Sequence, residues 1–154
     1  MSDAISAILN HDAISLRLEG RKKPEIIREL VELLAGTGVV TDLESVTAEV
    51  IAREELATTG IGSGIAIPHC LSADVTGTAI AFGRKVPGAR FDAVDKQPVQ
   101  IFFLMVGLPD AHNEHLRLLS KLSRYLHDAD TKAGLLAAQS PEEILEVFAR
   151  RERR

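Results

Sequence analysis

Cysteine is nearly absent from this chain and tryptophan is absent altogether: one cysteine and no tryptophan occur among 154 residues. A single cysteine cannot close an internal disulfide, which excludes a disulfide-stabilised scaffold and favours a reducing compartment. Long hydrophobic runs are also missing, since the longest, Ile101 to Val106, is far shorter than the ~20 apolar residues that span a bilayer. The first residues, Met1-Ser2-Asp3, lack the basic and apolar regions of a secretory signal. We therefore expect a cytoplasmic protein without membrane insertion.

The chain also has no excess of basic residues. The formal net charge is −4, which argues against nucleic-acid binding, because that function needs a basic surface. Hydrophobic residues make up 45% of the chain and charged residues 26%, as in an ordinary globular protein. A length of 154 residues fits one domain, since domains commonly have about 100–200 residues. The sequence predicts a single domain over residues 1–154.

The periodicity of apolar residues predicts an α/β fold. Some segments carry apolar residues at helical spacing, and others are short β-branched runs. Asp42 and Ser140 are candidate helix N-caps, and Pro87-Gly88 predicts a turn. Strands interleaved with helices indicate a layered α/β domain. We expect strands at 13–18, 65–67, 77–86 and 99–106, and helices that begin at 24, at 41 or 42, at 114, at 130 and at 141.

The segment 58–70 is the most informative part of the chain. Glycines at alternate positions, Gly60, Gly62 and Gly64, are followed by a β-branched run, a proline and His69. Glycine tolerates positive φ and lets a ligand approach the backbone, while Pro68 stiffens the chain just before the histidine. No Gly-Lys-Ser/Thr follows, so the segment is not a Walker A loop, and its spacing also fails the dinucleotide-binding fingerprint.

His69 is the candidate nucleophile of this segment. A neutral imidazole has a free ring nitrogen near pH 7 that can attack phosphorus. The anionic product needs donors, and the backbone N–H groups of Gly60, Gly62, Ser63 and Gly64 are the predicted phosphate-binding groups. The alternative is a histidine that merely packs on a turn.

Two further side chains are candidates for the same site. Arg53 precedes the glycine-rich segment and can pair with phosphate oxygens through its planar guanidinium, or can be a solvated residue balanced by Glu54 or Glu55. His115, in the first turn of a predicted helix, can donate a hydrogen bond to a phosphoryl group if the fold brings it to His69. An exposed histidine near a loop is the alternative for His115, and is favoured for His112.

A zinc site is a competing interpretation of the same histidines. Imidazole and thiolate groups are zinc ligands, but the sequence has neither the CxxC nor the HExxH spacing of common zinc sites. Asp92 and Asp95 are favoured as turn residues over a catalytic carboxylate pair. We therefore expect no metal and no cofactor. The set of possible zinc ligands is His69, Cys70, His112 and His115.

Several segments, taken in order, resemble one known family. The sequence is similar to the type-2 enzyme IIA domains of the phosphoenolpyruvate-dependent phosphotransferase system (PTS), the fructose/mannitol and nitrogen-regulatory class. The resemblance covers nearly the whole chain. It rests on Arg53-Glu54-Glu55, on Thr59 to His69 with the phosphorylation-site signature, on Phe91 to Val99, and on His115 to Leu122.

The resemblance implies a fold and a function. The implied fold is a mixed central β-sheet with helices on both faces, a three-layer α/β/α arrangement. His69 is then the phosphoryl acceptor, with Arg53 and His115 at the positions that flank it. The implied donor is HPr or a related phosphocarrier protein. A freestanding chain favours the nitrogen-regulatory branch, which binds regulatory target proteins. The alternatives are a sugar-specific IIA that passes the phosphoryl group to an enzyme IIB cysteine, and a zinc-binding or non-catalytic interaction module.

Overall fold

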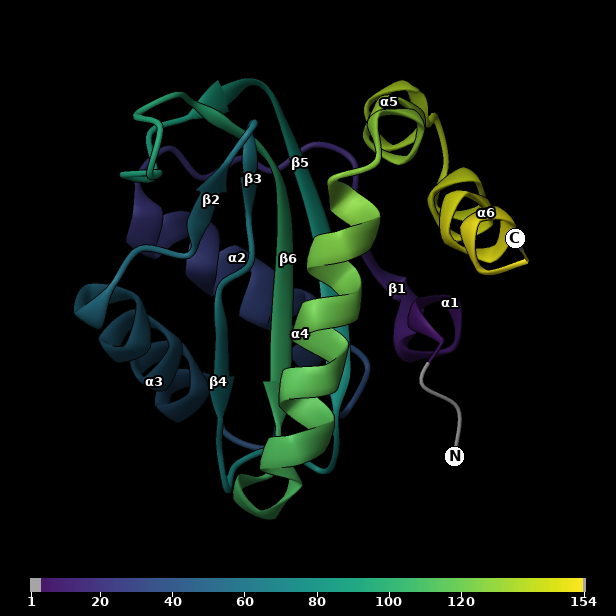
Figure 1. The fold of residues 1–154 in the computed structure, drawn as a ribbon. Coiled ribbons are helices and arrows are strands. Elements are labelled where there is room, and N and C mark those ends of the chain that lie inside the picture. The colour runs from purple at the N-terminus through teal and green to yellow at the C-terminus, as the bar shows by residue number, and fades with distance from the viewer. Residues whose placement is uncertain (1–3, 154) are drawn as a thin grey trace.

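The computed structural model describes residues 4–153, in which a mixed six-stranded sheet lies between two layers of helices (Figure 1). This arrangement confirms the expected three-layer α/β/α fold. The helices are α1 (Ile5–Ile8), α2 (Lys23–Ala35), α3 (Leu43–Leu56), α4 (His112–Leu126), α5 (Ala129–Ala137) and α6 (Pro141–Glu152), with a 3-10 turn at Pro109–Ala111. The strands are β1 (Leu9–Ser15), β2 (Gly60–Gly62), β3 (Ile65–Ala66), β4 (His69–Leu71), β5 (Ala79–Ala89) and β6 (Val99–Gly107).

Strand β6 is the centre of the sheet. The strand order is β1-β5-β6-β3-β2, and β4 pairs with β6 further along the same edge as β3. Strands β3 and β4 are both parallel to β6, while β5 is antiparallel to it. The unbroken apolar run from Ile101 to Val106 in β6 is explained by burial on both faces, as predicted. Its side chains alternate between the two cores: Ile101, Phe103 and Met105 on one side, Phe102, Leu104 and Val106 on the other.

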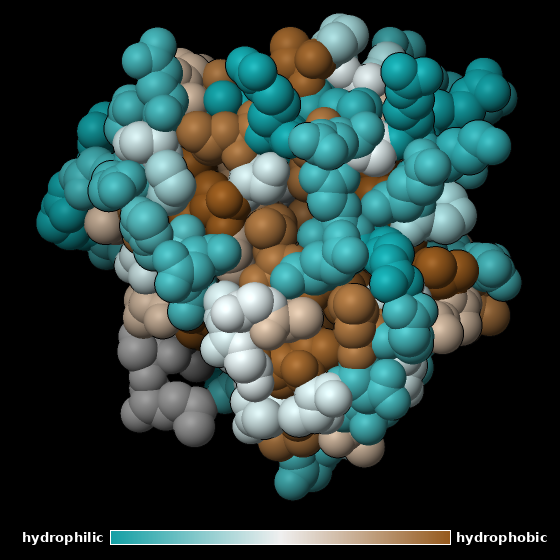
Figure 2. All heavy atoms as spheres, turned by 180° about the vertical axis from the view of Figure 1, so that it is seen from behind, coloured by the Kyte–Doolittle hydropathy of each residue, from teal (hydrophilic) through white to brown (hydrophobic). Residues whose placement is uncertain are grey.

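Each face of the sheet has its own helical layer. Helices α2 and α3 cover the core that contains Phe102, and helices α1, α4, α5 and α6 cover the core that contains Phe103. Figure 2 views the molecule from behind, on the side of α2, where hydrophobic residues show between hydrophilic ones. Leu33 and Ile51 are partly buried residues of this layer. Among the helices within residues 4–153, none is both long and apolar enough to cross a membrane.

The two predicted helix N-caps agree with the structure, and the other predicted helices begin within two residues of their expected starts. The Asp42 carboxylate accepts a hydrogen bond from the Ser45 N–H at 3.0 Å and caps α3. Ser140 caps α6 in the same way through the Glu143 N–H at 3.2 Å. These contacts satisfy backbone donors that a helix start leaves without a partner.

Two sequence-based element boundaries are wrong. The first strand runs over Leu9–Ser15 instead of 13–18, because the buried Leu9 pairs with Ile80 across an irregular register. The turn expected at Pro87-Gly88 does not end β5, which continues to Ala89 across a register shift. Such irregular positions tolerate proline inside a strand, since proline cannot donate to a regular ladder.

The glycine-rich segment is a β-hairpin. Strands β2 and β3 are antiparallel and are joined by Ser63 and Gly64, whose φ angles are 58° and 78°. Two successive positive φ angles are the requirement of a type I′ hairpin turn. Gly60 is needed for a different reason, because a Cβ there would lie 2.8 Å from the Cα of Ala93. The glycines are therefore explained by the turn and by close backbone packing.

Candidate functional site

His69 is held at the start of β4 with one ring nitrogen free. His69 is paired with Met105 of β6 in the sheet. The carbonyl of the preceding residue, Pro68, accepts a hydrogen bond from the Met105 N–H at 3.0 Å. The ring Nδ1 lies 2.7 Å from the carbonyl oxygen of Ile67. Because a carbonyl oxygen only accepts, Nδ1 carries the hydrogen, and Nε2 keeps its lone pair. The contact orients a half-buried imidazole with a nucleophilic nitrogen available.

The structure brings His115 to His69. The two ring centroids are 5.6 Å apart, and the ring planes are inclined by 53°. His115 lies in the first turn of α4 and is 4% exposed. Within residues 4–153, neither of its ring nitrogens has a hydrogen-bond partner. A buried polar group without a partner is unusual, and here it lies beside the candidate nucleophile.

Both imidazoles are neutral near pH 7. Burial lowers the pKa of His69 from 6.5, and the positive charge of Arg53 lowers it further, although the bond to the Ile67 carbonyl opposes them. Burial also lowers the pKa of His115 to about 4, with further contributions from His69 and His112. Desolvation disfavours the charged ring in each case. A neutral His69 has the lone pair that nucleophilic attack requires.

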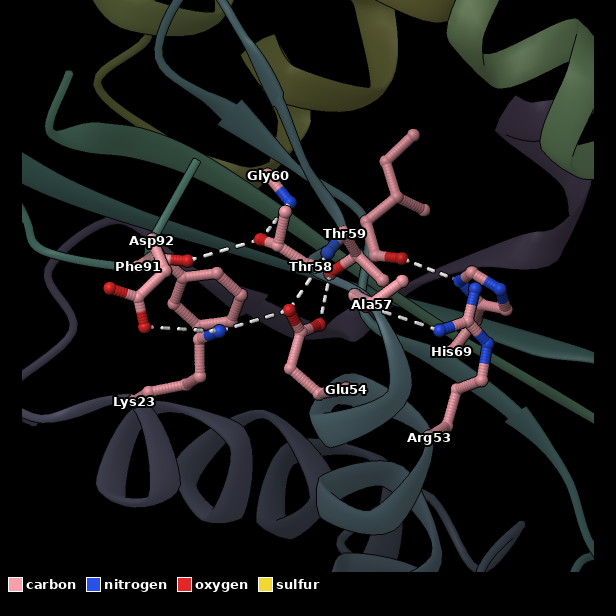
Figure 3. A network of polar contacts seen from close by, with 11 residues as sticks. Lys23, Arg53, Glu54, Ala57, Thr58, Thr59, Gly60, His69, Phe91 and Asp92 are labelled. Carbon is pink, nitrogen blue, oxygen red and sulfur yellow. Dashed lines mark hydrogen bonds and ion pairs between the residues drawn. The ribbon is translucent and has the colours of Figure 1, made fainter. Parts of the chain in front are cut away.

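Arg53 reaches the site from the last turn of α3. Its guanidinium lies beside the His69 imidazole (Figure 3) and donates a hydrogen bond to the Ala57 carbonyl at 3.2 Å. The structure thus brings together three predicted side chains, those of His69, His115 and Arg53. An imidazole with a free nitrogen, a second buried imidazole and a guanidinium can together hold an anionic group on Nε2.

The glycines predicted to bind phosphate lie elsewhere. Gly64 accepts hydrogen bonds from β6 at Gln100 and Ile101, whereas His69 pairs with Met105. Ile101 and Met105 are four residues apart along β6, so the positions of Gly64 and His69 beside this strand are separated by about 13 Å. The N–H groups of Gly60 and Ser63 are also occupied, by Thr58 Oγ1 at 3.0 Å and by the Asp95 carboxylate at 3.0 Å. The expectation that Gly60, Gly62, Ser63 and Gly64 surround a phosphoryl group on His69 is not supported by this arrangement.

The adjacent residues His69 and Cys70 do not face the same space. Cys70 belongs to the core under α2 and α3, whereas the His69 ring lies against His115. Successive strand residues point to opposite faces, which explains the separation. Burial raises the pKa of the Cys70 thiol to about 12, so this side chain is a protonated core group near pH 7. No three His, Cys, Asp or Glu side chains within residues 4–153 are placed to hold a metal ion together.

The sequence analysis missed the role of Glu54, which it considered only as a charge that balances Arg53. Glu54 is 4% exposed as a whole residue and lies on the buried face of α3, whereas Glu55 is exposed. It accepts hydrogen bonds from the N–H of Thr59 at 2.8 Å and from the Thr59 hydroxyl, and pairs with Lys23 at 3.1 Å. A sequence signal was present: Glu54 follows Val46 and Val50 at intervals of four residues, which places it on the apolar face of α3, whereas Glu55 lies off that face.

Acidification should destabilise the protein through His115. Its pKa is about 4 in the folded chain and 6.5 when unperturbed, so between these values the unfolded chain binds more protons. The contribution to stability is present above pH 6.5 and is lost as the pH falls towards 4. It amounts to at most about 3 kcal/mol. Urea unfolding of His115→Gln between pH 7 and pH 4.5 should show a shallower fall in stability than the wild type. The control is the exposed His127→Gln variant, because His127 does not contribute to the pKa shift of His115. Equal pH dependence in wild type and His115→Gln would contradict the prediction.

Comparisons with known sequences identify one family. The family described as "Phosphoenolpyruvate-dependent sugar phosphotransferase system, EIIA 2" matches residues 7–151. The fructose-specific EIIA component of Haloferax volcanii is 35% identical over 94% of this chain and 94% of its own length. The fructose-specific EIIABC component of Bacillus subtilis is also 35% identical over 94% of this chain, which spans only 23% of that longer protein.

Solved structures show the same similarity. The crystal structure of nitrogen regulatory protein IIA-Ntr from Neisseria meningitidis has a TM-score of 0.87 and 33% identity, covering 94% of this chain and 98% of its own. The complex of enzyme IIAMtl and phosphorylated enzyme IIBMtl from Escherichia coli contains a chain with a TM-score of 0.78 and 26% identity, covering 91% of this chain and 96% of its own. Sugar-specific and regulatory proteins are both among the similar proteins.

Proposed function

Because this chain belongs to the EIIA 2 family of the phosphoenolpyruvate-dependent sugar phosphotransferase system, we propose that it carries a phosphoryl group on Nε2 of His69. One observation carries the proposal: the Ile67 carbonyl holds the hydrogen on Nδ1, which leaves Nε2 unprotonated on a ring whose centroid lies 5.6 Å from that of the buried His115. A histidine in a merely structural role would not need a second buried imidazole without a hydrogen-bond partner beside it.

The proposed transfer exchanges one N–P bond for another. The lone pair of His69 Nε2 attacks the phosphorus of a phosphohistidine on the donor, and a new N–P bond forms. The N–P bond of the donor breaks, and its electron pair returns to the donor ring nitrogen. The hydrogen on His69 Nδ1 stays on its nitrogen, bound to the Ile67 carbonyl. No cofactor enters the step, because the phosphoryl group is already activated on the donor.

Arg53 and His115 are the proposed stabilising groups. The neutral His115 ring has one N–H, which can donate to a phosphoryl oxygen on His69. The Arg53 guanidinium supplies positive charge beside the same oxygens. One cation and one neutral donor stabilise the phosphorylated state only moderately, and a carrier needs this because a very stable phosphohistidine would not pass its group on.

The proposed partners follow from the family. An HPr-like phosphocarrier protein in the cytoplasm donates the phosphoryl group. If the protein is sugar-specific, the acceptor is a cysteine of an enzyme IIB. If it is nitrogen-regulatory, it has no such acceptor and signals to target proteins by its phosphorylation state. Relatives of both kinds are present, at 35% and 33% identity. Onward transfer distinguishes the two.

Phosphorylation by the general components of the system tests the proposal. Incubation with phosphoenolpyruvate, enzyme I and HPr should add one acid-labile, base-stable phosphoryl group per chain, measured by intact mass. Addition of a fructose-type and of a mannitol-type enzyme IIB then distinguishes the branches: loss of the group to either indicates a sugar-specific protein, and retention with both indicates a regulatory one. No incorporation from phosphorylated HPr or from a nitrogen-branch carrier would contradict the proposed function.

A further inference from the structure

Two side chains from the last turn of α3 hold the segment 57–59, which lies just before the β2–β3 hairpin. Arg53 donates to the carbonyl of Ala57, and Glu54 accepts from the N–H and hydroxyl of Thr59. Figure 3 shows the two side chains diverging from the helix, with Arg53 towards His69 and Glu54 towards Lys23. Adjacent residues of one helix thus hold both ends of a three-residue segment. The position of this segment is set by α3.

The same segment holds the backbone that orients His69. The Thr59 carbonyl accepts the N–H of Ile67 at 3.0 Å. The carbonyl of that same residue, Ile67, then accepts the hydrogen on Nδ1 of His69 at 2.7 Å. A continuous path of hydrogen bonds therefore leads from the Glu54 carboxylate through Thr59 and Ile67 to the imidazole. Displacement of Thr59 would move the carbonyl that fixes the tautomer of His69.

Glu54 is itself fixed by a counter-charge. Lys23 lies 3.1 Å from the Glu54 carboxylate, 3.7 Å from the Asp92 carboxylate and 4.6 Å from the centroid of the Phe91 ring. The Glu54 side chain is 2% exposed and that of Lys23 is 22% exposed. A buried ion pair adds little to stability compared with apolar side chains of the same size. Stability alone therefore does not account for a carboxylate at this position.

From these contacts we propose that Glu54 is a positioning residue for phosphoryl transfer. Its carboxylate holds Thr59, and through Thr59 the Ile67 carbonyl, so that His69 keeps its hydrogen on Nδ1 and presents Nε2. Glu54 also keeps the segment 57–59 in place, and the Ala57 carbonyl of this segment accepts the hydrogen bond from Arg53. The role rests on the proposed carrier function of His69. Glu54 acts through these groups and does not touch the phosphoryl group.

Two variants and two matched controls test the role. Thr59→Val removes the hydroxyl donor and keeps the N–H, and Glu54→Gln removes the charge with little change in shape. Glu55→Gln changes the exposed neighbour on the same helix, and Thr59→Ser keeps a hydroxyl at residue 59. The readouts are the ¹⁵N shifts of the His69 ring, which report the tautomer, and the rate of phosphoryl transfer from phosphorylated HPr.

We expect the wild type and both controls to show one tautomer, with hydrogen on Nδ1. Thr59→Val and Glu54→Gln should show both tautomers and a transfer rate lower by about ten- to a hundredfold, with an unchanged KM for the donor, because misalignment of a reacting atom has effects of this size. If Glu54→Gln does not fold, Thr59→Val decides. A folded Glu54→Gln variant with wild-type tautomer and rate would overturn the inference, and so would a folded Thr59→Val variant with the same result. Absence of phosphorylation in the wild type would contradict the carrier function instead, and the tautomer would still be measured.

Discussion

Replacement of His69 with alanine should reduce phosphoryl incorporation from one group per chain to none. The substitution removes the Nε2 lone pair, and no neighbouring group in the described site can take its place. The ring of His115 is buried, and the Cys70 thiol faces the opposite core and stays protonated. Incubation with phosphoenolpyruvate, enzyme I and HPr, followed by intact mass measurement, gives the result directly.

His127 offers a matched control for this experiment. Its Nδ1 lies 2.7 Å from the Ser123 carbonyl, the same kind of contact that His69 makes with Ile67 at 2.7 Å. His127 is exposed at the end of α4, whereas His69 lies beside His115. His127→Ala should therefore keep full incorporation. Incorporation into a folded His69→Ala chain would show that another residue is the acceptor.

Replacement of His115 with alanine should slow transfer to His69 by about 10²- to 10³-fold, the effect of removing one oriented donor from a charged transition state. The His115 ring lies 5.6 Å from the His69 ring, close enough for its N–H to reach a phosphoryl oxygen there. The acceptor nitrogen itself is untouched, so slow incorporation should still reach one group per chain. Rapid-quench measurement with phosphorylated HPr gives the rate.

A variant of the neighbouring His112 is the control for effects that come only from losing an imidazole in the first turn of α4. It begins α4 and is exposed, so His112→Ala should transfer at a rate close to that of the wild type. His115→Asn keeps an N–H donor on a shorter side chain and should be less impaired than His115→Ala. Equal rates for His115→Ala and the wild type would remove His115 from the transfer step.

The fold could be predicted from the sequence where local signals are strong. Helix caps such as Asp42 and the apolar run of β6 depend on short-range chemistry, and both predictions are confirmed. The boundaries of β1 and β5 were wrong because they depend on partners far along the chain. Leu9 joins β1 through its pairing with Ile80, and β5 continues past Pro87 through its pairing with β6. Neither pairing has a signal in the local sequence.

The site was predictable in part for the same reason. The glycine pattern predicts a phosphate-binding loop, whereas in the structure it forms a type I′ turn and packs closely against Ala93, and glycine spacing alone cannot distinguish the two. The approach of His115 to His69 depends on how α4 packs on the sheet. Helical spacing from Val46 and Val50 places Glu54 on the apolar face of α3, but its contacts with Thr59 and Lys23 depend on the folded chain.

The register in which β4 pairs with β6 decides which face of the sheet His69 and Cys70 each occupy, and these two neighbours always lie on opposite faces. A slip of one residue in a strand turns every side chain to the other face. In a slipped molecule the imidazole would enter the core beneath α3, and the sulfur atom would reach the surface beside His115. Loss of transfer would then coincide with a newly reactive thiol, so alkylation of Cys70 reports the fraction of molecules whose strand is out of place.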